Sequence, residues 1–130
     1  MEKLFEKLIK LAKENNDKNV FRGMDARDYF ECFDSELKEA KQELKDNNVI
    51  YLEDELGDLL WIFMNLLIKF EKDGLIVSGE SLLNRVYEKF LQRINEVDNK
   101  NEEEKYAAWD KIKSKQKQEL LAEHNKKYNN

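Results

Sequence analysis

Proline is absent from this chain of 130 residues, and glycine occurs only four times. Proline breaks the interior of a helix and glycine weakens it, so the scarcity of both favours long helices. No stretch alternates apolar and polar residues as a half-buried strand does. A chain of this length forms one domain and can bury roughly two thirds of its unfolded surface. The sequence therefore predicts a single all-α domain over residues 1–130.

The chain has one cysteine, Cys32, and one histidine, His124. A single cysteine cannot form an internal disulfide, so we expect a reducing compartment and a cytoplasmic location. A ferritin-like di-iron protein needs Glu-x-x-His motifs on two helices, which one histidine cannot supply. No apolar run approaches the roughly 20 residues that span a bilayer, and the amphipathic N-terminus lacks a signal-peptide core. We therefore expect no membrane partner.

Charged residues make up 39% of the chain, hydrophobic residues make up 41%, and the formal net charge is −5. This mixture suits helices that turn an apolar stripe to a core and a charged face to water. The negative balance disfavours binding to nucleic acid or to an anionic membrane. It is compatible with a small anionic ligand that is held by a metal ion or by a local basic cluster.

Five helical segments are predicted from apolar periodicity and from capping signals. Their expected ranges are Glu2–Glu14, Ala26–Lys45, Tyr51–Lys72, Gly79–Val97 and Glu102–His124. Asp25 is a candidate N-cap of the second segment. Residues 125–130 are expected to form a frayed tail. Five helices of this kind predict a helical bundle.

Acidic residues border the apolar faces of the second and third segments. Glu36 and Glu39 are one turn apart beside the apolar stripe of the second segment. Glu55 and Asp58 are one turn apart in the third segment, directly before LLWIFMNLLIKF, which is apolar nearly all round. Gly57 lies between them and suggests the close approach of another backbone. We therefore expect two acid pairs to face a core from two neighbouring helices.

Acid pairs that meet inside a fold need a partner that neutralises them. Carboxylates about 5 Å apart repel each other by roughly 3 kcal/mol per pair at an effective dielectric constant of 20. A cation removes this repulsion, and all-oxygen ligands favour Mg²⁺, Mn²⁺ or Ca²⁺ over zinc or copper. The alternative is that the acids from Glu53 to Asp58 only stabilise a helix start through its macrodipole. The residues alone leave both interpretations open.

The order of the motifs resembles that of a known family. Glu36-x-x-Glu39, followed by Glu55-x-x-Asp58 within ELGDLLW, is similar to the paired signature of the MazG-like nucleoside triphosphate pyrophosphohydrolases. Downstream, YEKFLQRINEVD resembles the family stretch with a lysine and an arginine four residues apart. WDKIK resembles the family's final tryptophan–lysine pair, and the four matches follow the family's order.

The resemblance implies an all-α bundle of about five helices, whose four-helix core is completed by dimerisation in a homodimer or homotetramer. It implies an enzyme that hydrolyses a nucleoside triphosphate to the monophosphate and pyrophosphate, with water attacking the α-phosphorus. Mg²⁺, or Mn²⁺ in its place, would be the cofactor, and Glu36 and Glu39 would be catalytic. The implied metal ligands are Glu36, Glu39, Glu55 and Asp58. The implied substrate-binding residues are Lys89, Arg93, Trp109 and Lys113.

Two positions depart from the family pattern. Ser35 stands where many members have a glutamate ahead of the first acid pair, and Tyr87 stands where the basic stretch usually has an asparagine. The alternative function, from a different class, is a non-catalytic helical interaction module whose acids form a negative surface for a basic partner. Mg²⁺ should raise the melting temperature of a metal site and should do little for solvated acids.

Overall fold

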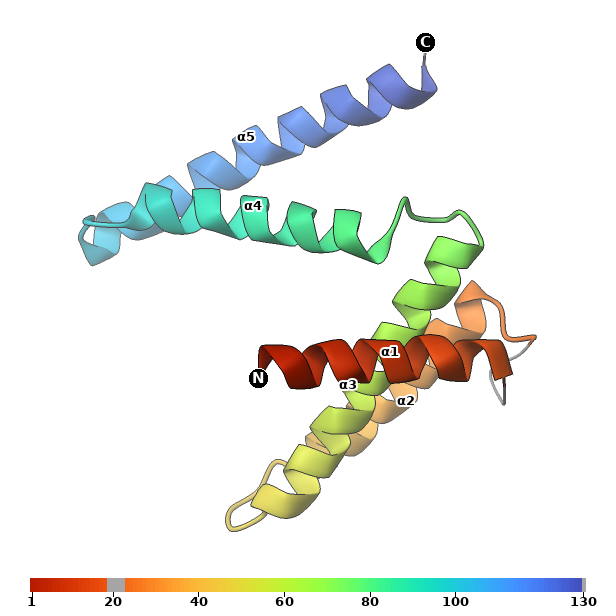
Figure 1. Ribbon diagram of the computed structural model, residues 1–130. Helices are drawn as coiled ribbons and strands as arrows, with labels where there is room; N and C mark the ends of the chain where they lie inside the picture. Colours follow the sequence, from red (N-terminus) through yellow and green to blue (C-terminus); the bar gives the residue numbers. More distant parts are fainter. Residues whose placement is uncertain (19–22, 130) are drawn as a thin grey trace. The chain divides into compact units, whose positions relative to one another are not determined.

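The computed structural model describes residues 1–18 and 23–129, where the chain forms five α-helices and no strand (Figure 1). The helices are α1 (Glu2–Lys18), α2 (Ala26–Gln42), α3 (Val49–Lys72), α4 (Gly79–Val97) and α5 (Glu102–Tyr128). The predicted all-α class and the five helices are confirmed. In the described ranges, no helix has both the length and the apolar character that crossing a bilayer requires.

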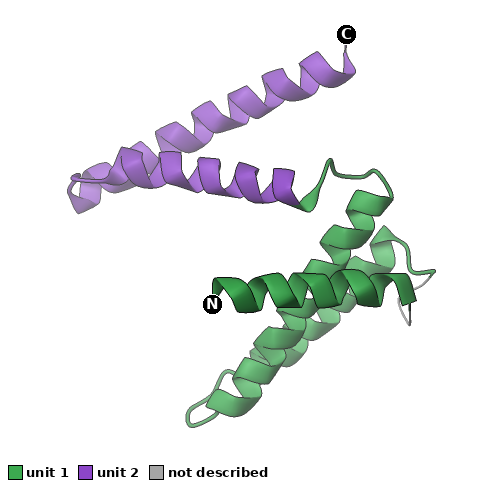
Figure 2. Cartoon of the chain, viewed as in Figure 1, with its two compact units in different colours: residues 1–79 green, residues 80–130 purple. Residues whose placement is uncertain are grey.

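The helices form two compact units, which are described separately (Figure 2). Unit 1 comprises residues 1–79 and contains α1, α2 and α3. Unit 2 comprises residues 80–130 and contains α5 and nearly all of α4. The structure divides the chain into two units, and the single domain expected over residues 1–130 therefore stays a prediction.

In unit 1, α2 and α3 form a hairpin, and α1 packs against α3 (Figure 1). Asn16 of α1 ties the three helices together, because its side-chain amide donates to the Tyr29 hydroxyl at 3.5 Å and to the Asn65 carbonyl at 3.4 Å. An ion pair between Lys72 and Asp17 joins the ends of α3 and α1. The buried apolar residues of this unit are Ala12, Tyr29, Ala40, Ile62, Met64 and Leu66.

The turn between α2 and α3 differs from the sequence prediction. α2 ends at Gln42 and not at Lys45, and α3 begins at Val49, two residues early. The side-chain amide of Asn48 donates at 2.7 Å to both the backbone carbonyl and the carboxylate of Glu43, which closes the turn. At the start of α2, the predicted N-cap is confirmed, because Asp25 accepts from the backbone N–H of the third helical residue in a capping box.

The predicted helix ends of α1 and α5 are too early. α1 continues to Lys18, and α5 continues through Tyr128, so the frayed tail expected from residue 125 is wrong for residues 125–128. The rings of His124 and Tyr128, one turn apart, have centroids 4.9 Å apart and support the last turn of α5. Basic residues in that turn also suit the negative end of the helix dipole.

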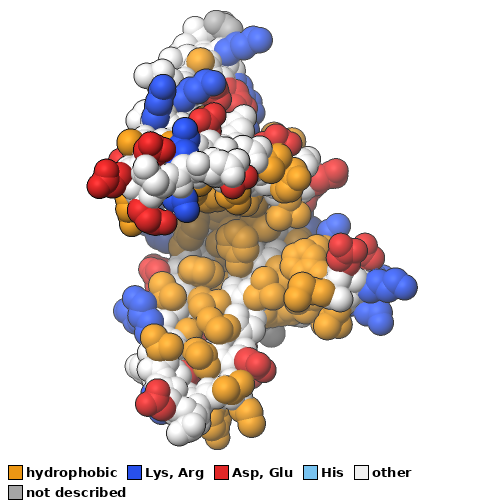
Figure 3. All heavy atoms as spheres, turned by 90° about the vertical axis from the view of Figure 1, so that its left-hand side faces the viewer, with side chains coloured by type: hydrophobic (Ala, Val, Ile, Leu, Met, Phe, Trp, Pro, Cys, Tyr) orange, Lys and Arg blue, Asp and Glu red, His pale blue; other side chains and the backbone are white. Residues whose placement is uncertain are grey.

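Large hydrophobic side chains remain exposed on unit 1 (Figure 3). Leu56, Leu60 and Phe63 follow one face of α3 and keep 50%, 41% and 40% of their surface exposed. A helix that is apolar nearly all round is normally covered on several sides, and the described chain leaves this face of α3 uncovered. A side chain added at Gly57 would meet no neighbouring atom within 4 Å, so the described chain does not supply the close backbone expected there.

In unit 2, side chains join α4 and α5 at three levels. Arg85 pairs with Glu123, Arg93 bonds to Gln116, and the ring of Phe90 lies against that of Trp109 with centroids 6.4 Å apart. The buried residues at this junction are Arg93, Ile112 and Gln116. Two of the three are polar, so the unit has a polar centre.

Candidate functional site

The α2–α3 hairpin brings all four predicted acids together. Glu36, Glu39 and Glu55 each offer a carboxylate oxygen within 4.8 Å of the others. Asp54, Glu55 and Asp58 form a second group within the same limit. Glu55 belongs to both groups, so the two are continuous, and we call these five residues the acid cluster. Asp54 was missed by the sequence analysis, although it lies one turn from Asp58 on the same face of α3.

The position of the acid cluster in α3 tests the macrodipole interpretation of its charge. α3 begins at Val49 and has no acidic residue in its first turn. The macrodipole acts on charges only within about one turn of the helix end. Asp54, Glu55 and Asp58 all lie beyond that turn, so the proposal that they merely stabilise a helix start is wrong.

The electrostatics of the acid cluster are unfavourable without a cation. Burial, followed by a hydrogen bond with Glu39 and by the charges of Glu39, Asp58 and Glu55, raises the pKa of Glu36 from 4.5 to about 7. Burial also raises the pKa of Glu55, with Glu39 and Asp58 adding to the effect. The pKa of Asp58 is raised by burial, by Asp54 and by Glu39. At Glu36, Glu55 and Asp58 the protonated carboxyl group is thus favoured more strongly than it is in water.

Although Glu36 is hydrogen-bonded to Glu39, two buried oxygens of the acid cluster have no hydrogen-bond partner. One oxygen of Glu36 and one oxygen of Glu55, Oε2 in each, is buried without a hydrogen bond. Among the ion pairs of residues 1–18 and 23–129, none involves a member of the cluster. Buried, unpaired carboxylate oxygens are retained where a proton or a cation completes them. The cluster could therefore hold a metal ion, and its all-oxygen donor set fits a hard divalent cation.

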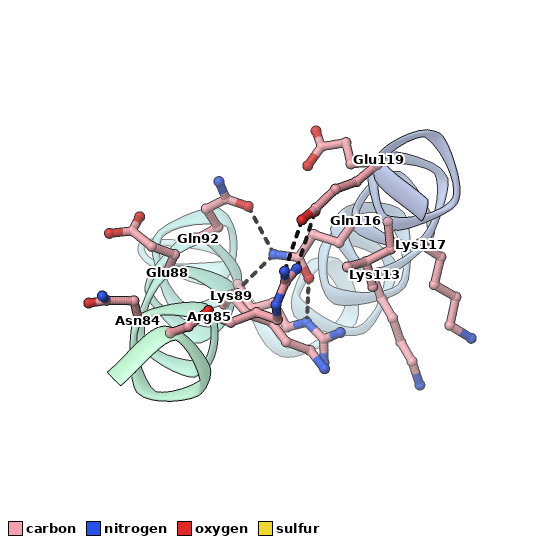
Figure 4. A pocket seen from close by; sticks show the side chains of 13 residues that line it. Asn84, Arg85, Glu88, Lys89, Gln92, Lys113, Gln116, Lys117 and Glu119 are labelled. Atoms are coloured by element: carbon pink, nitrogen blue, oxygen red, sulfur yellow. Dashed lines mark hydrogen bonds and ion pairs between the residues drawn. The ribbon is translucent and has the colours of Figure 1, made fainter. Parts of the chain in front are cut away.

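Unit 2 contains a cavity of about 660 Å³ between α4 and α5 (Figure 4). Three of the four predicted substrate-binding residues, Lys89, Arg93 and Lys113, line it. The fourth, Trp109, does not line the cavity but contacts Arg93, which does. The guanidinium carbon of Arg93 lies 5.3 Å from the ring centroid of Trp109 and 5.3 Å from that of Phe90. Unit 2 thus gathers the predicted basic residues, as unit 1 gathers the acids.

Not every cation of the cavity is available to a ligand. Arg85 donates to both carboxylate oxygens of Glu123, at 3.2 and 2.9 Å, and this lowers the pKa of Glu123. In contrast, no ion pair of the described residues involves Lys89, Arg93 or Lys113. We call these three residues the basic group of the cavity.

Gln116 is the residue of this cavity that sequence analysis missed. It is buried and reaches from α5 toward α4, where it bonds to Arg93 (Figure 4). It lies three residues after Lys113, so the shared helix face was visible in the sequence, but no motif singled it out.

Comparison of the chain with protein-family models, with curated proteins and with solved structures found no match. The relation to the MazG-like family therefore remains a resemblance of motifs. The acid cluster and the basic group are the observations on which a function can be built.

Proposed function

We propose that this protein is a Mg²⁺-dependent nucleoside triphosphate pyrophosphohydrolase of the MazG-like kind. The observation that carries the proposal is the acid cluster. Buried oxygens of Glu36 and Glu55 have no hydrogen-bond partner there, and no cationic side chain of residues 1–18 and 23–129 is paired with the acids. Buried acids without partners are typical of a metal-binding site, whereas the acids of a solvated surface are hydrated by water. The basic group of the cavity supports an anionic substrate.

Glu36, Glu39, Glu55 and Asp58 would hold the metal, with Asp54 as a further ligand. When bound, Mg²⁺, or Mn²⁺ in its place, would polarise the phosphate and lower the pKa of water. Glu36 or Glu39 would accept the proton of the attacking water on a carboxylate oxygen.

Lys89, Arg93 and Lys113 would bind the phosphates, and Arg93 is suited to bidentate contact with phosphate oxygens. Trp109 would support Arg93 through its ring face and could wall the nucleotide site. The water oxygen would form a bond to the α-phosphorus, while the bond breaks between the α-phosphorus and the oxygen that bridges it to the β-phosphorus. The products would be the nucleoside monophosphate and pyrophosphate.

The sequence gives little support to attack at the γ-phosphorus. It contains no GxxxxGK[ST] loop to cradle the β- and γ-phosphates. The lone His124 stands near the end of α5 without a nucleophile beside it in sequence. Attack of water at the α-phosphorus uses only the carboxylates and cations already described.

We further propose that a second copy of the chain covers α3, in a homodimer or homotetramer located in the cytoplasm. The exposed row of Leu56, Leu60 and Phe63 supports this, since soluble monomers rarely leave large contiguous apolar surfaces in water. Sedimentation equilibrium at micromolar concentration should give a dimer or larger, and a monomer alone would contradict this part of the proposal.

The function is tested with a panel of standard and modified nucleoside triphosphates in Mg²⁺, with pyrophosphate release as the readout. The wild type should release pyrophosphate, Asp58→Asn should not, and Asp34→Asn should behave as the wild type because Asp34 is exposed outside the cluster. In ¹⁸O-water the label should enter the monophosphate. Label in pyrophosphate, or release of orthophosphate alone, would refute attack at the α-phosphorus. If the protein shows no turnover and no rise in melting temperature with Mg²⁺, the result would support the helical interaction module instead.

A further inference from the structure

Arg93 is a buried cation that forms no ion pair with a carboxylate of the described residues. The residue is only 7% exposed, and no ion pair within the described ranges includes it. Burying an unpaired charge is unfavourable, so a fold that keeps one must supply polar contacts or an anion from outside. The faces of Phe90 and Trp109, each with its centroid 5.3 Å from the guanidinium carbon, supply part of the compensation.

The only hydrogen bond that the Arg93 side chain makes within the described chain is to Gln116. Nε of Arg93 donates to Oε1 of Gln116 at 2.8 Å. The two terminal nitrogens of the guanidinium make no hydrogen bond to described residues, although they carry four of its five N–H groups. Arg93 therefore lines the cavity with its orientation set at Nε and with most of its donors uncommitted.

The two ends of the Gln116 side chain have different partners. Its oxygen accepts from Arg93, while its nitrogen donates to the Lys89 backbone carbonyl at 3.0 Å and to Oε1 of Gln92 at 2.9 Å (Figure 4). A carboxylate at this position could accept from Arg93 but could not donate to the Lys89 carbonyl. It would also neutralise the guanidinium. A glutamine can hold Arg93 in place and leave its charge for a ligand.

We propose that Gln116 is a positioning residue for phosphate binding: it orients Arg93 through Nε and, being a neutral amide, preserves the positive charge of the cavity for a polyphosphate chain. The bond from Gln116 to the Lys89 backbone carbonyl anchors the amide that holds Arg93. The inference rests on the proposed function for the identity of the ligand. The contacts among Gln116, Arg93 and Lys89 do not depend on it.

The test uses the full chain and inorganic tripolyphosphate, with binding measured by calorimetry in EDTA at low ionic strength. Gln116→Ala should weaken binding by about tenfold, the size expected for misplacing one charge-assisted phosphate contact. Gln116→Glu should weaken it at least as much, because the added charge cancels that of Arg93. Gln118→Ala is the matched control: Gln118 is exposed on the same helix and does not line the cavity, so binding should not change.

A double-mutant cycle identifies the route by which Gln116 acts. Arg93→Ala should weaken binding, and adding Gln116→Ala to Arg93→Ala should have no further effect, because the second residue acts only through the first. Additive losses, an unchanged affinity in Gln116→Ala, or no binding by the wild type would overturn the inference. Where Gln116→Ala lowers the folded fraction, Gln116→Met keeps the side-chain volume, and the same outcomes apply to it.

Turnover separates this inference from the proposed function. With a nucleoside triphosphate substrate, Gln116→Ala should raise KM by about tenfold and change kcat little, as loss of a contact shared by ground and transition states does. A residue that only stabilises the fold would lower the concentration of active enzyme and leave KM unchanged. An intact coupling to Arg93 in calorimetry without any pyrophosphate release would overturn the proposed function and keep the role of Gln116.

Discussion

Replacing Glu36 by glutamine removes one negative charge from the acid cluster and keeps the size of the side chain. Glu36 is the informative position because its pKa is raised from 4.5 to about 7, first by burial and then by Glu39. Its Oε2 atom is also buried without a partner. At pH 8 the Glu36 carboxylate is largely ionised, so Glu36→Gln should relieve its repulsion with Glu39 and Glu55.

Two calculations set an upper limit on the stabilisation that Glu36→Gln should give to the metal-free protein. The pKa rise of Glu36 from 4.5 to about 7 corresponds to an upper figure of about 3 kcal/mol at pH 8. Coulomb's law gives about 3 kcal/mol for one carboxylate pair at 4.8 Å and an effective dielectric constant of 20. The Glu39 side chain is exposed, so solvent screens the repulsion. After that reduction we expect Glu36→Gln to raise the free energy of unfolding by about 1–2 kcal/mol in EDTA.

In Mg²⁺ the wild type should become more stable than Glu36→Gln, which reverses the order of their free energies of unfolding in EDTA. A ligand present at 100 times its dissociation constant stabilises the folded wild type by about 2.7 kcal/mol. Glu36→Gln should lose most of that gain, because it lacks one ligand of the cluster. Urea unfolding at pH 8, in EDTA and in Mg²⁺, measures both effects.

Glu31→Gln is the control for this experiment, since Glu31 is an exposed acid of α2 outside the cluster. It should change the stability by less than about 0.5 kcal/mol in either buffer. The reasoning would be refuted if Glu36→Gln were less stable than the wild type in EDTA, or if it kept the full response to Mg²⁺.

Three further outcomes are expected. Asp58→Asn should abolish pyrophosphate release while calorimetry shows an apoprotein at least as stable as the wild type, because Asp58 is held among like charges. The free energy of unfolding of the metal-free wild type should fall as the pH rises from about 4.5 to about 7, since folded Glu36 keeps a proton that the unfolded chain has released; urea titrations across that range measure the slope. Gly57→Ala should raise stability by about 0.4–1 kcal/mol, because the added methyl group meets nothing within 4 Å. A loss of stability at Gly57, measured together with sedimentation, would show that another subunit's backbone covers the site.

The sequence predicted the acid cluster because the relevant information is local. Pairs at i and i+3 on a helix share a face whatever the rest of the fold does. That rule placed Glu36 with Glu39 and Glu55 with Asp58, and a hairpin of two neighbouring helices then brought the pairs together. Asp54 obeys the same rule but was passed over, because an exposed acid in a run of acids carries no distinguishing pattern.

Other features depend on contacts that periodicity does not contain. The end of α2 is set by the Asn48 amide, which bonds to the backbone and side chain of Glu43 in a turn of specific geometry. The role of Gln116 depends on how α5 packs on α4, since its partners Arg93 and Lys89 are more than twenty residues away along the chain. Such long-range pairings could not be read from helix faces alone.

The division of charge along the chain shows why a metal and the basic group would have separable effects. Residues 1–79 carry 18 acidic and 12 basic side chains, whereas residues 80–130 carry 10 acidic and 11 basic side chains. The acid cluster alone repels a triphosphate, so binding of phosphate there requires a cation that reverses the local sign. The cavity of unit 2 needs no such help, because Lys89, Arg93 and Lys113 have no carboxylate partners in the described structure. Chelation of the metal should therefore abolish turnover and spare the binding of tripolyphosphate, while removal of Arg93 should weaken that binding in the presence or absence of Mg²⁺.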